Sequence, residues 1–275
     1  MKLVMYSVNA GDVKAGLLED GEIRQLAGKD TNMISLIEEG VEQQSVGGES
    51  VALEDVKLHP PISRPGKIIG IGLNYKDHAA ETGAEIPEKP IVFAKYPNTI
   101  NGPGDPILIP KITEKADYEA ELAVVIGRSA RHVEAADTLD YVFGYMNAND
   151  VSSRDLQFSE GGQWTRSKSL DTFAPIGPYL VTKDEIEDPQ DLSVKCTLND
   201  EVMQDGTTSK MIFSVAELVS FLSTGMTLEP GDIIMTGTPP GVGGARDPQV
   251  FLKEGDEVTI EIGGLGALTN PIEAE

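Results

Sequence analysis

Residues 117–127 read Asp-Tyr-Glu-Ala-Glu-Leu-Ala-Val-Val-Ile-Gly, a mostly apolar run that ends in glycine and predicts a β-strand. Successive side chains of a strand point to opposite faces. Glu119 and Glu121 are therefore expected side by side on one face. The other face would be filled by Tyr118, Ala120, Leu122, Val124 and Ile126. The run thus predicts a buried strand with two carboxylates on one face.

Two ionised carboxylates near an apolar run repel each other, and one tends to protonate unless a cation lies between them. Asp150 follows in the run 147–150, Asn-Ala-Asn-Asp, and would complete a set of three carboxylates. Such a set suits a hard divalent ion such as Mg²⁺ or Mn²⁺. Acidic residues are 45 of 275, however, so pairs at this spacing are common by chance and do not establish a site alone.

The composition suggests one large domain, or a main domain with a small addition. The 29 Gly and 17 Pro, with only 5% aromatic residues, favour many turns and short strands over a helical bundle. Cys196 is the single cysteine, which excludes an internal disulfide and fits a reducing cytosol. We expect Cys196 to be a small buried residue.

The net charge of −23 argues against nucleic acid as a partner, because its binding depends on Lys and Arg neutralising phosphates. The same charge disfavours anionic membranes. No apolar run approaches the ~20 residues that span a bilayer, and the first residues do not form a signal peptide. We therefore expect a cytoplasmic protein with no membrane partner.

The order of elements predicts a mostly β fold with short helices (α+β), not an alternating doubly wound fold. Residues 1–62 are predicted to form a small N-terminal α+β domain and residues 63–275 the main domain, with a Pro-rich linker at 59–66. Expected helices outside the first domain cover residues 75–81, 135–140, 152–158 and 214–224. Expected strands there cover residues 67–72, 91–94, 107–109, 119–126, 141–149, 176–181, 193–198, 232–236 and 256–262.

His78 and Glu81 follow the strand at 67–72 on a predicted helix. Side chains three residues apart on a helix are neighbours, so the Glu81 carboxylate can reach the imidazole. Such a pair fixes the tautomer and leaves the other ring nitrogen free to take a proton from water. On this segment alone, a solvated surface pair is the favoured interpretation. His59 is placed in the linker and His132 in a loop, so few other histidines could serve as a base.

Three further segments carry polar candidates. Asp150 could cap the helix after it instead of binding metal, Arg154 could pair with Asp155, and the Gln157 amide could meet a substrate oxygen or solvent. Arg166 and Lys168 would share a face if their segment were extended, either for anion recognition or as ordinary salt bridges. The loop 236–244, Thr-Gly-Thr-Pro-Pro-Gly-Val-Gly-Gly, has amides and hydroxyls suited to a carboxylate. It is not a phosphate-binding Walker loop, and no G-x-G-x-x-G unit is present, so we expect no nucleotide cofactor.

The succession of these segments closely resembles the fumarylacetoacetate hydrolase family. It consists of residues 72–81 with His78 and Glu81, residues 89–95, residues 118–122, residues 149–157, residues 168–173 and the Thr-Gly-Thr-Pro of residues 236–239. The resemblance covers roughly residues 65–271, and the first domain resembles the small domain of many members. It implies a mixed β-roll catalytic domain and a homodimer, as relatives commonly form.

The resemblance also implies roles for individual residues. Glu119, Glu121 and Asp150 match the ligands of one divalent ion, Mg²⁺ or Mn²⁺. His78 and Glu81 match the water-activating dyad, on a short helix that often closes as a lid. Lys168 matches a catalytic position at the bound oxo acid, and Gln157, Arg154 and Thr238 are assigned to substrate binding.

The activity implied is hydrolysis of a C–C bond in an acylpyruvate-type 2-oxo (di)acid through a metal-stabilised enolate, with pyruvate or a related oxo acid released. Isomerisation or decarboxylation of 2-hydroxymuconate-type oxo-dioates, or decarboxylation of oxaloacetate, shares that enolate and stays open. A non-catalytic acidic protein that only binds cations is a third interpretation. It predicts that the three carboxylates lie dispersed.

Overall fold

Strand β12 (Ala120–Ile126) lies inside the largest sheet of the computed structural model, which describes residues 1–275 except 10, 28–31, 42–44, 48–49 and 160. Within the described residues this sheet runs in the order β4 (Ser45–Val46), β3 (Glu22–Ala27), β2 (Lys14–Glu19), β1 (Lys2–Ser7), β15 (Ala174–Thr182), β13 (Val142–Asn149), β12, β18 (Ile233–Met235), β7 (Ile68–Gly72) and β8 (Ile91–Lys95). Three short strands join its sides: β5 (Val51–Ala52) on β3, β6 (Lys57–His59) on β1 and β9 (Ile100–Asn101) on β15.

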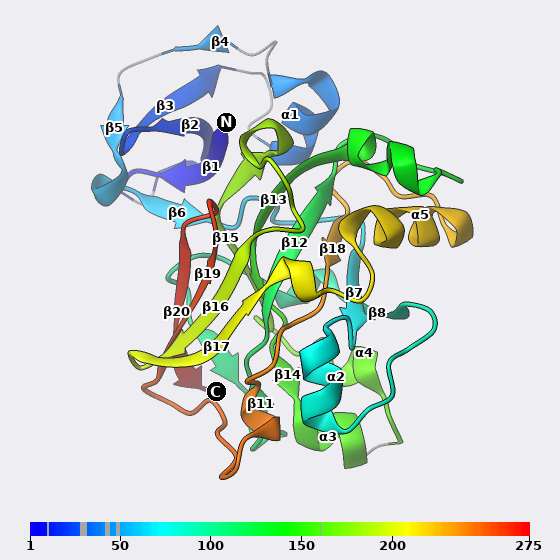
Figure 1. The fold of residues 1–275 in the computed structure, drawn as a ribbon. Helices are drawn as coiled ribbons and strands as arrows, with labels where there is room; N and C mark the ends of the chain where they lie inside the picture. The colour runs from blue at the N-terminus through cyan, green and yellow to red at the C-terminus, as the bar shows by residue number, and fades with distance from the viewer. Residues whose placement is uncertain (10, 28–31, 42–44, 48–49, 160) are drawn as a thin grey trace.

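A second sheet covers one face of the first (Figure 1) and runs in the order β10 (Ile107–Ile109), β20 (Ala267–Ala274), β19 (Glu257–Ile262), β16 (Ser193–Leu198) and β17 (Glu201–Thr207). A small ladder pairs β11 (Ala116–Asp117) with β14 (Ser152–Ser153). The described α-helices are α1 (Met33–Glu39), α2 (Lys76–Thr82), α3 (Arg154–Ser159), α4 (Trp164–Lys168) and α5 (Val215–Gly225). The described 3-10 turns cover Leu53–Asp55, Pro97–Thr99, Ala135–Tyr141, Lys183–Glu185, Thr208–Lys210 and Gly243–Ala245.

Strand β12 separates two hydrophobic cores, as its alternation predicts. The side chains of one face, Tyr118, Ala120, Leu122, Val124 and Ile126, all pack in the core shared with the second sheet and α5. Ala123 and Val125 on the other face belong to the core that reaches the N-terminal strands and α1. Glu119 and Glu121 continue this second face at the start of the strand. One face of β12 thus anchors the fold at one end and carries the carboxylates at the other.

The small N-terminal domain lies before residue 67, and its strands extend the main sheet (Figure 1). Strand β1 is antiparallel to β15, with Lys2 opposite Val181 and Leu3 opposite Leu180. The fold is mixed α+β and mostly strands, so the expected fold class is confirmed. The division between residues 62 and 63 stays a prediction.

Several local expectations need correction. His59 is not in the linker but ends β6, where its backbone pairs with Met5 and its ring bonds the Ser7 hydroxyl at 2.8 Å. The helix expected from residue 152 begins at Arg154, because Ser152 and Ser153 pair with β11 instead. Residues 135–141 form a 3-10 helix rather than an α-helix. Strands β17 and β20 were not expected, since their alternation is interrupted by Gly, Asn and Pro.

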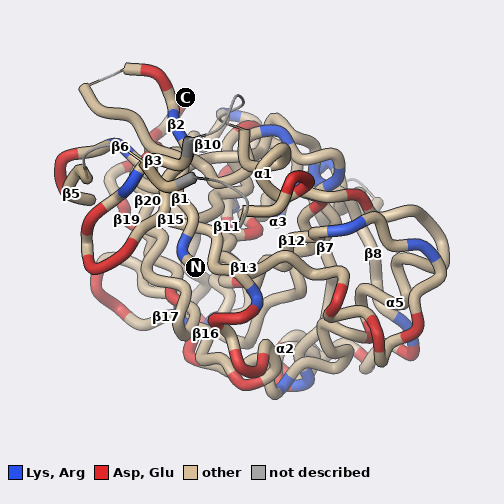
Figure 2. Tube along the Cα trace, turned by 90° about the horizontal axis from the view of Figure 1, so that it is seen from above, with Lys and Arg blue, Asp and Glu red and all other residues tan. Residues whose placement is uncertain are grey.

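The helix prediction at 214–224 is confirmed by α5, whose start is fixed by a capping box between Ser214 and Glu217. Cys196 is buried and free, as expected. Figure 2 shows acidic positions along loops and edges on every visible side of the tube rather than in one patch.

Among the described residues, no helix is both long enough and apolar enough to cross a membrane.

Candidate metal centre and substrate cavity

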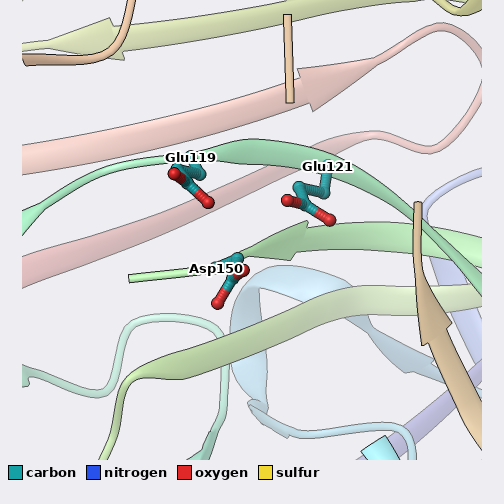
Figure 3. Close-up of side chains that lie close together, drawn as sticks. All are labelled: Glu119, Glu121 and Asp150. Carbon is teal, nitrogen blue, oxygen red and sulfur yellow. The ribbon is translucent and has the colours of Figure 1, made fainter. Parts of the chain in front are cut away.

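Glu119, Glu121 and Asp150 converge at the start of β12 and the end of β13, and Figure 3 shows the two glutamates on the same side of one strand with Asp150 on the neighbouring segment. Ala120 lies opposite Asn149 in the ladder, and the Asp150 amide donates to the Glu119 carbonyl at 2.9 Å. One oxygen from each carboxylate lies within 4.8 Å of the others, and all three residues are buried. The carboxylates are therefore convergent, and the interpretation that requires them dispersed is wrong.

Buried cations hold two of these carboxylates in place. The Lys168 ammonium donates to Glu119 at 2.7 Å, to Asp150 at 2.7 Å and to the Ser152 hydroxyl at 2.6 Å. These three bonds use all its N–H donors. Lys95 donates to the other Asp150 oxygen at 2.6 Å and to the Val151 carbonyl at 3.1 Å. Asp150 therefore serves this cluster and does not cap the helix after it.

Glu121 differs from its neighbours because no ion pair involves it in the described part of the chain. Its carboxylate accepts one hydrogen bond, from the Gly237 amide at 2.8 Å. Burial, together with the nearby charges of Asp150 and Glu119, raises the pKa of Glu121 well above its usual range. Burial also acts to raise the pKa of Glu119, but Lys168 and Arg154 outweigh it and hold that pKa below its usual value. The unmet charge of the cluster is therefore concentrated at Glu121.

The donor set fits one divalent ion. Among the described residues it consists of three hard carboxylate oxygens within reach of one another, and no sulfur or imidazole takes part. The raised pKa of Glu121 shows that its ionised form lacks a compensating cation. Oxygen ligands of this kind suit Mg²⁺ or Mn²⁺ rather than softer metals. The described residues thus form a cluster suited to a divalent metal ion.

The dyad of His78 and Glu81 forms on helix α2. The Nδ1 atom of His78 lies 3.1 Å from a Glu81 oxygen, and His78 is buried. Glu81 also accepts the Gly241 amide at 2.9 and 3.1 Å, so it ties α2 to the loop 236–244. The turn into α2 is fixed by Asn74, which bonds the backbone of Phe213 and Thr236. The pair is therefore part of the wall of a cavity, with the imidazole buried and Glu81 exposed to solvent.

The loop 236–244 approaches the cluster through glycine. Gly237 has φ +97°, and a Cβ there would lie 2.7 Å from the Asn74 Cβ and 3.2 Å from the Ile71 carbonyl oxygen. The next residue, Thr238, donates to the Ala120 carbonyl at 2.9 Å and accepts from Gln204 at 2.7 Å. The loop thus brings both an amide for Glu121 and a fixed hydroxyl to the cluster.

Replacing Gly237 by alanine is expected to destabilise the protein by about 1–3 kcal/mol, because an L-residue is strained at this φ and its Cβ collides with Asn74. Thermal unfolding of Gly237→Ala measures the loss. Gly225→Ala is the matched control, since a Cβ at Gly225 meets nothing within 4 Å. Equal melting temperatures for the two variants would contradict the assigned strain.

Asp117 connects this loop to Arg154. Its fully buried carboxylate accepts the Gly243 amide at 2.7 Å, the Gly244 amide at 2.9 Å and the Arg154 Nε–H at 2.8 Å. The same guanidinium donates to Glu119 at 2.6 Å and to Gln157 at 3.1 Å. Arg154 therefore does not pair with Asp155, which accepts from Ser153 and Thr113 instead. Asp117 sets the position of Arg154 and the end of the loop together.

Asp117→Asn is expected to lower stability by roughly 3–5 kcal/mol, because it removes one partner of a buried ion pair and faces an amide NH₂ toward the two glycine amides. Denaturant unfolding measures the change. Asp155→Asn changes a carboxylate in the same region that makes no ion pair in the described residues, and a much smaller loss is expected. Equal losses of stability in the two variants would contradict the proposal that Asp117 holds Arg154 and the loop 236–244 in position.

One cavity of about 870 Å³ brings the predicted site residues together. Its lining includes His78, Glu81, Glu119, Glu121, Arg154, Gln157, Lys168 and Thr238. Apolar side chains form much of the remaining wall, among them Ile71, Phe93, Phe158, Trp164, Val242 and Phe251. The functional roles of these residues stay predictions, but the structure places all of them except buried Asp150 on one cavity surface.

Arg166 and Lys168 do not share a face, because their segment is helix α4 and not extended. Residues two apart on a helix point in different directions. Lys168 is buried at the carboxylates, whereas Arg166 is exposed.

Three site residues were not assigned a role from the sequence: Lys95, Asp117 and Gln204. Lys95 could have been noticed in the sequence, because alternation along strand β8 places it on the same buried face as Phe93, where an apolar residue is usual. Gln204, whose side chain also bonds the Ala120 amide and the Pro239 carbonyl, lies in the unexpected strand β17. No pattern within β17 links it to a loop more than thirty residues further on.

Comparison with known proteins agrees with this geometry. Residues 67–273 match the family model described as fumarylacetoacetate (FAA) hydrolase C-terminal. A curated relative, the rat (Rattus norvegicus) mitochondrial oxaloacetate tautomerase Fahd2a, is 44% identical over 247 residues, which cover 87% of this chain and 79% of the relative.

Two solved structures have the same fold over the whole chain. A fumarylacetoacetate hydrolase from Exiguobacterium antarcticum has a TM-score of 0.87 at 35% identity, and covers 100% of both chains. A 2-hydroxyhepta-2,4-diene-1,7-dioate isomerase from Mycobacterium marinum has a TM-score of 0.84 at 37% identity, and covers 100% of this chain and 99% of that one. Together with the buried carboxylate cluster, these matches show that the chain belongs to the fumarylacetoacetate hydrolase family of enzymes.

Proposed function

We propose that this protein hydrolyses the C–C bond of an acylpyruvate-type 2-oxo acid. The observation that carries the proposal is the position of the His78 and Glu81 pair on the same cavity wall as Glu119 and Glu121. A base and a metal cluster that face one space can act on a single substrate. The product released would be pyruvate or a related oxo acid.

Glu81 orients the base in this proposal. An imidazole whose Nδ1–H donates to Glu81 has its Nε2 lone pair free to accept a proton from water. The hydroxide then attacks the carbonyl carbon distal to the pyruvate unit. The bond between that carbon and the pyruvate methylene breaks, and its electron pair passes into the pyruvate enolate, which takes up a proton.

Glu119, Glu121 and Asp150 would hold Mg²⁺ or Mn²⁺, which supplies Lewis-acid stabilisation of the negative charge that develops beside the 2-oxo group. Lys168 adds a fixed positive charge at the same place. Burial acts to lower the pKa of Lys168, but Asp150 and Glu119 outweigh it and raise that pKa, so the ammonium stays charged. Because its three N–H donors are taken, its contribution is electrostatic as the site stands.

The substrate carboxylate would lie near Arg154, Gln157 and Thr238, which line the cavity beside the cluster. Arg154 is itself held by Asp117 and Glu119, so it enters the reaction already oriented. A pre-positioned guanidinium loses little freedom on binding a carboxylate.

A second candidate is proton transfer at the carbon next to the 2-oxo group, as in tautomerisation of oxaloacetate or isomerisation of an oxo-dioate. The rat relative is named as an oxaloacetate tautomerase and the mycobacterial structure as an isomerase, which favours this reaction class. The same His78 would move the proton, and the same cluster would stabilise the enolate. Decarboxylation of oxaloacetate also needs that enolate.

A substrate panel distinguishes these reactions. Acylpyruvates, oxaloacetate and 2-hydroxymuconate-type dioates would be followed by proton NMR in D₂O with Mg²⁺, with Mn²⁺ and with EDTA. Cleavage with a carboxylic acid and pyruvate as products supports hydrolysis. Deuterium entry next to the 2-oxo group without cleavage supports tautomerisation instead. If no substrate changes faster with metal than with EDTA, both candidates fail.

A homodimer and a cytoplasmic location stay predictions from the sequence. Sedimentation analysis of the purified protein would measure the first.

A further inference from the structure

We propose that Lys115, with the ring of Phe251, binds a second carboxylate at the far end of the substrate, so that the enzyme selects 2-oxo-dioates over monocarboxylic 2-oxo acids. The inference rests on the proposed function, since it names the substrate class of the same cavity.

The cations of the cavity wall carry the argument. Among the described residues, Lys115, Arg154 and Lys168 are the cations that line it. Lys168 is paired with Glu119 and Asp150, and Arg154 is paired with Asp117 and the same Glu119. Lys115 makes no ion pair within the described residues. Of the described cations in this lining, Lys115 is therefore the one whose charge an incoming anion can neutralise.

The small β11–β14 ladder determines where Lys115 lies. Ala116 is opposite Ser153, and the Arg154 amide donates to the Lys115 carbonyl at 2.9 Å, so the two cationic residues are neighbours across the ladder. Asp117, the partner of the guanidinium, stands two residues further along, or about 7 Å of extended chain. Asp117 is fully buried and Lys115 is exposed. Lys115 therefore lies at the outer end of the cavity, away from the carboxylate cluster.

Phe251 limits the freedom of the Lys115 side chain. The Lys115 Nζ lies 5.8 Å from the centre of the Phe251 ring, and both residues line the cavity. Such a cation–π contact holds an ammonium over a ring while its N–H donors stay available. The apolar ring also reduces water around the charge, which strengthens its attraction for a carboxylate.

The net negative charge of the whole chain makes a local positive charge at Lys115 important for binding a dianion. A protein with a net charge of −23 repels dianions, so a dianionic substrate needs local positive charge where each carboxylate binds. Arg154 is available for the carboxylate beside the 2-oxo group, and Lys115 for the distal one. A monocarboxylic substrate would leave Lys115 without a partner.

The test compares two ligands of equal length, 2-oxohexanedioate and 2-oxohexanoate, which differ only in the terminal carboxylate. Binding is followed by the fluorescence of Trp164, the single tryptophan, which lines the cavity. Titrations use the full chain with Mg²⁺. The wild type is expected to bind the dioate about 5- to 10-fold more tightly than the monocarboxylate. This ratio lies between the small effect of an exposed charge pair and the large effect of a buried one.

Lys115→Met is expected to remove this preference, and Lys115→Arg to retain most of it. Lys111→Met is the matched control, because Lys111 is an exposed lysine of the same segment that does not line the cavity. The preference should also decrease as salt is added. Equal binding of the two ligands by the wild type, or an unchanged preference in Lys115→Met, overturns the inference.

The outcome does not depend on turnover. A dioate preference that disappears in Lys115→Met, in a protein that cleaves no acylpyruvate, supports this inference and refutes the proposed hydrolysis. Cleavage of acylpyruvates without any dioate preference does the reverse.

Discussion

Glu121→Gln is expected to raise the melting temperature of the metal-free protein at pH 8 and to remove its stabilisation by Mn²⁺. Burial and the charges of Asp150 and Glu119 raise the pKa of Glu121 in the folded state. Above the unfolded pKa of about 4.3, the unfolded chain ionises this group more readily than the folded one, so stability decreases as the pH rises toward the folded pKa. A neutral amide removes that loss.

The gain in Glu121→Gln should therefore shrink as the pH falls toward the unfolded pKa, where the carboxyl is protonated in both states. Bound metal should reverse the order of stability, because it stabilises the wild type and not the variant. In the wild type, Mn²⁺ at 100 times its dissociation constant stabilises by about 2.7 kcal/mol, and the variant should bind it at least about 100-fold more weakly. Melting curves with EDTA and with Mn²⁺, at pH 5 and pH 8, measure both effects.

Glu257→Gln serves as the control, since it changes an exposed glutamate of strand β19. Its melting temperature should be close to that of the wild type, with full stabilisation by Mn²⁺. If Glu121→Gln keeps the Mn²⁺ response of the wild type, the carboxylate cluster is not the metal site.

His78→Ala is expected to lower the rate of hydrolysis by about 10²- to 10⁴-fold, the usual contribution of a general base. Stabilisation by Mn²⁺ should survive, because His78 is not one of the three carboxylates that would hold the ion. Steady-state cleavage of an acylpyruvate, with a melting curve for each preparation, separates loss of the base from loss of the metal.

His132→Asn is the matched control for a missing imidazole. His132 lies in an exposed loop with φ +52°, a conformation that asparagine tolerates better than alanine. Full turnover is expected in this variant. Turnover near the wild-type rate in His78→Ala with bound Mn²⁺ would contradict the dyad in both candidate reactions.

The periodicity of the sequence was sufficient to predict side-chain contacts between residues that are close in the sequence or lie on the same strand. The alternation of residues 118–126 correctly predicted the two faces of β12, because side-chain direction in a strand follows from the backbone alone. The spacing of His78 and Glu81 correctly predicted their contact for the same reason on a helix. Local geometry determines both results.

Long-range partners were not predictable in the same way. The sequence left a pair of Arg154 with its neighbour Asp155 open, whereas the fold pairs Arg154 with Asp117 and Glu119, more than thirty residues away. These partners were missed because the β11–β14 ladder brings residue 117 beside residue 152, and two strands of two residues each leave no periodic signal. The extended conformation on which a shared face of Arg166 and Lys168 depended is not formed, because helix α4, only five residues long, was not expected there.

The sequence by itself predicted the three carboxylates, the shared strand face of the two glutamates, the contact between His78 and Glu81, and the family. Only the tertiary structure decided which charges are neutralised. Two lysines and an arginine bind Glu119 and Asp150, whereas Glu121 and Lys115 have no ion pair among the residues that the structure describes. The physical reason is that charge neutralisation depends on distances in space, and strand pairing sets these distances between segments far apart in the chain.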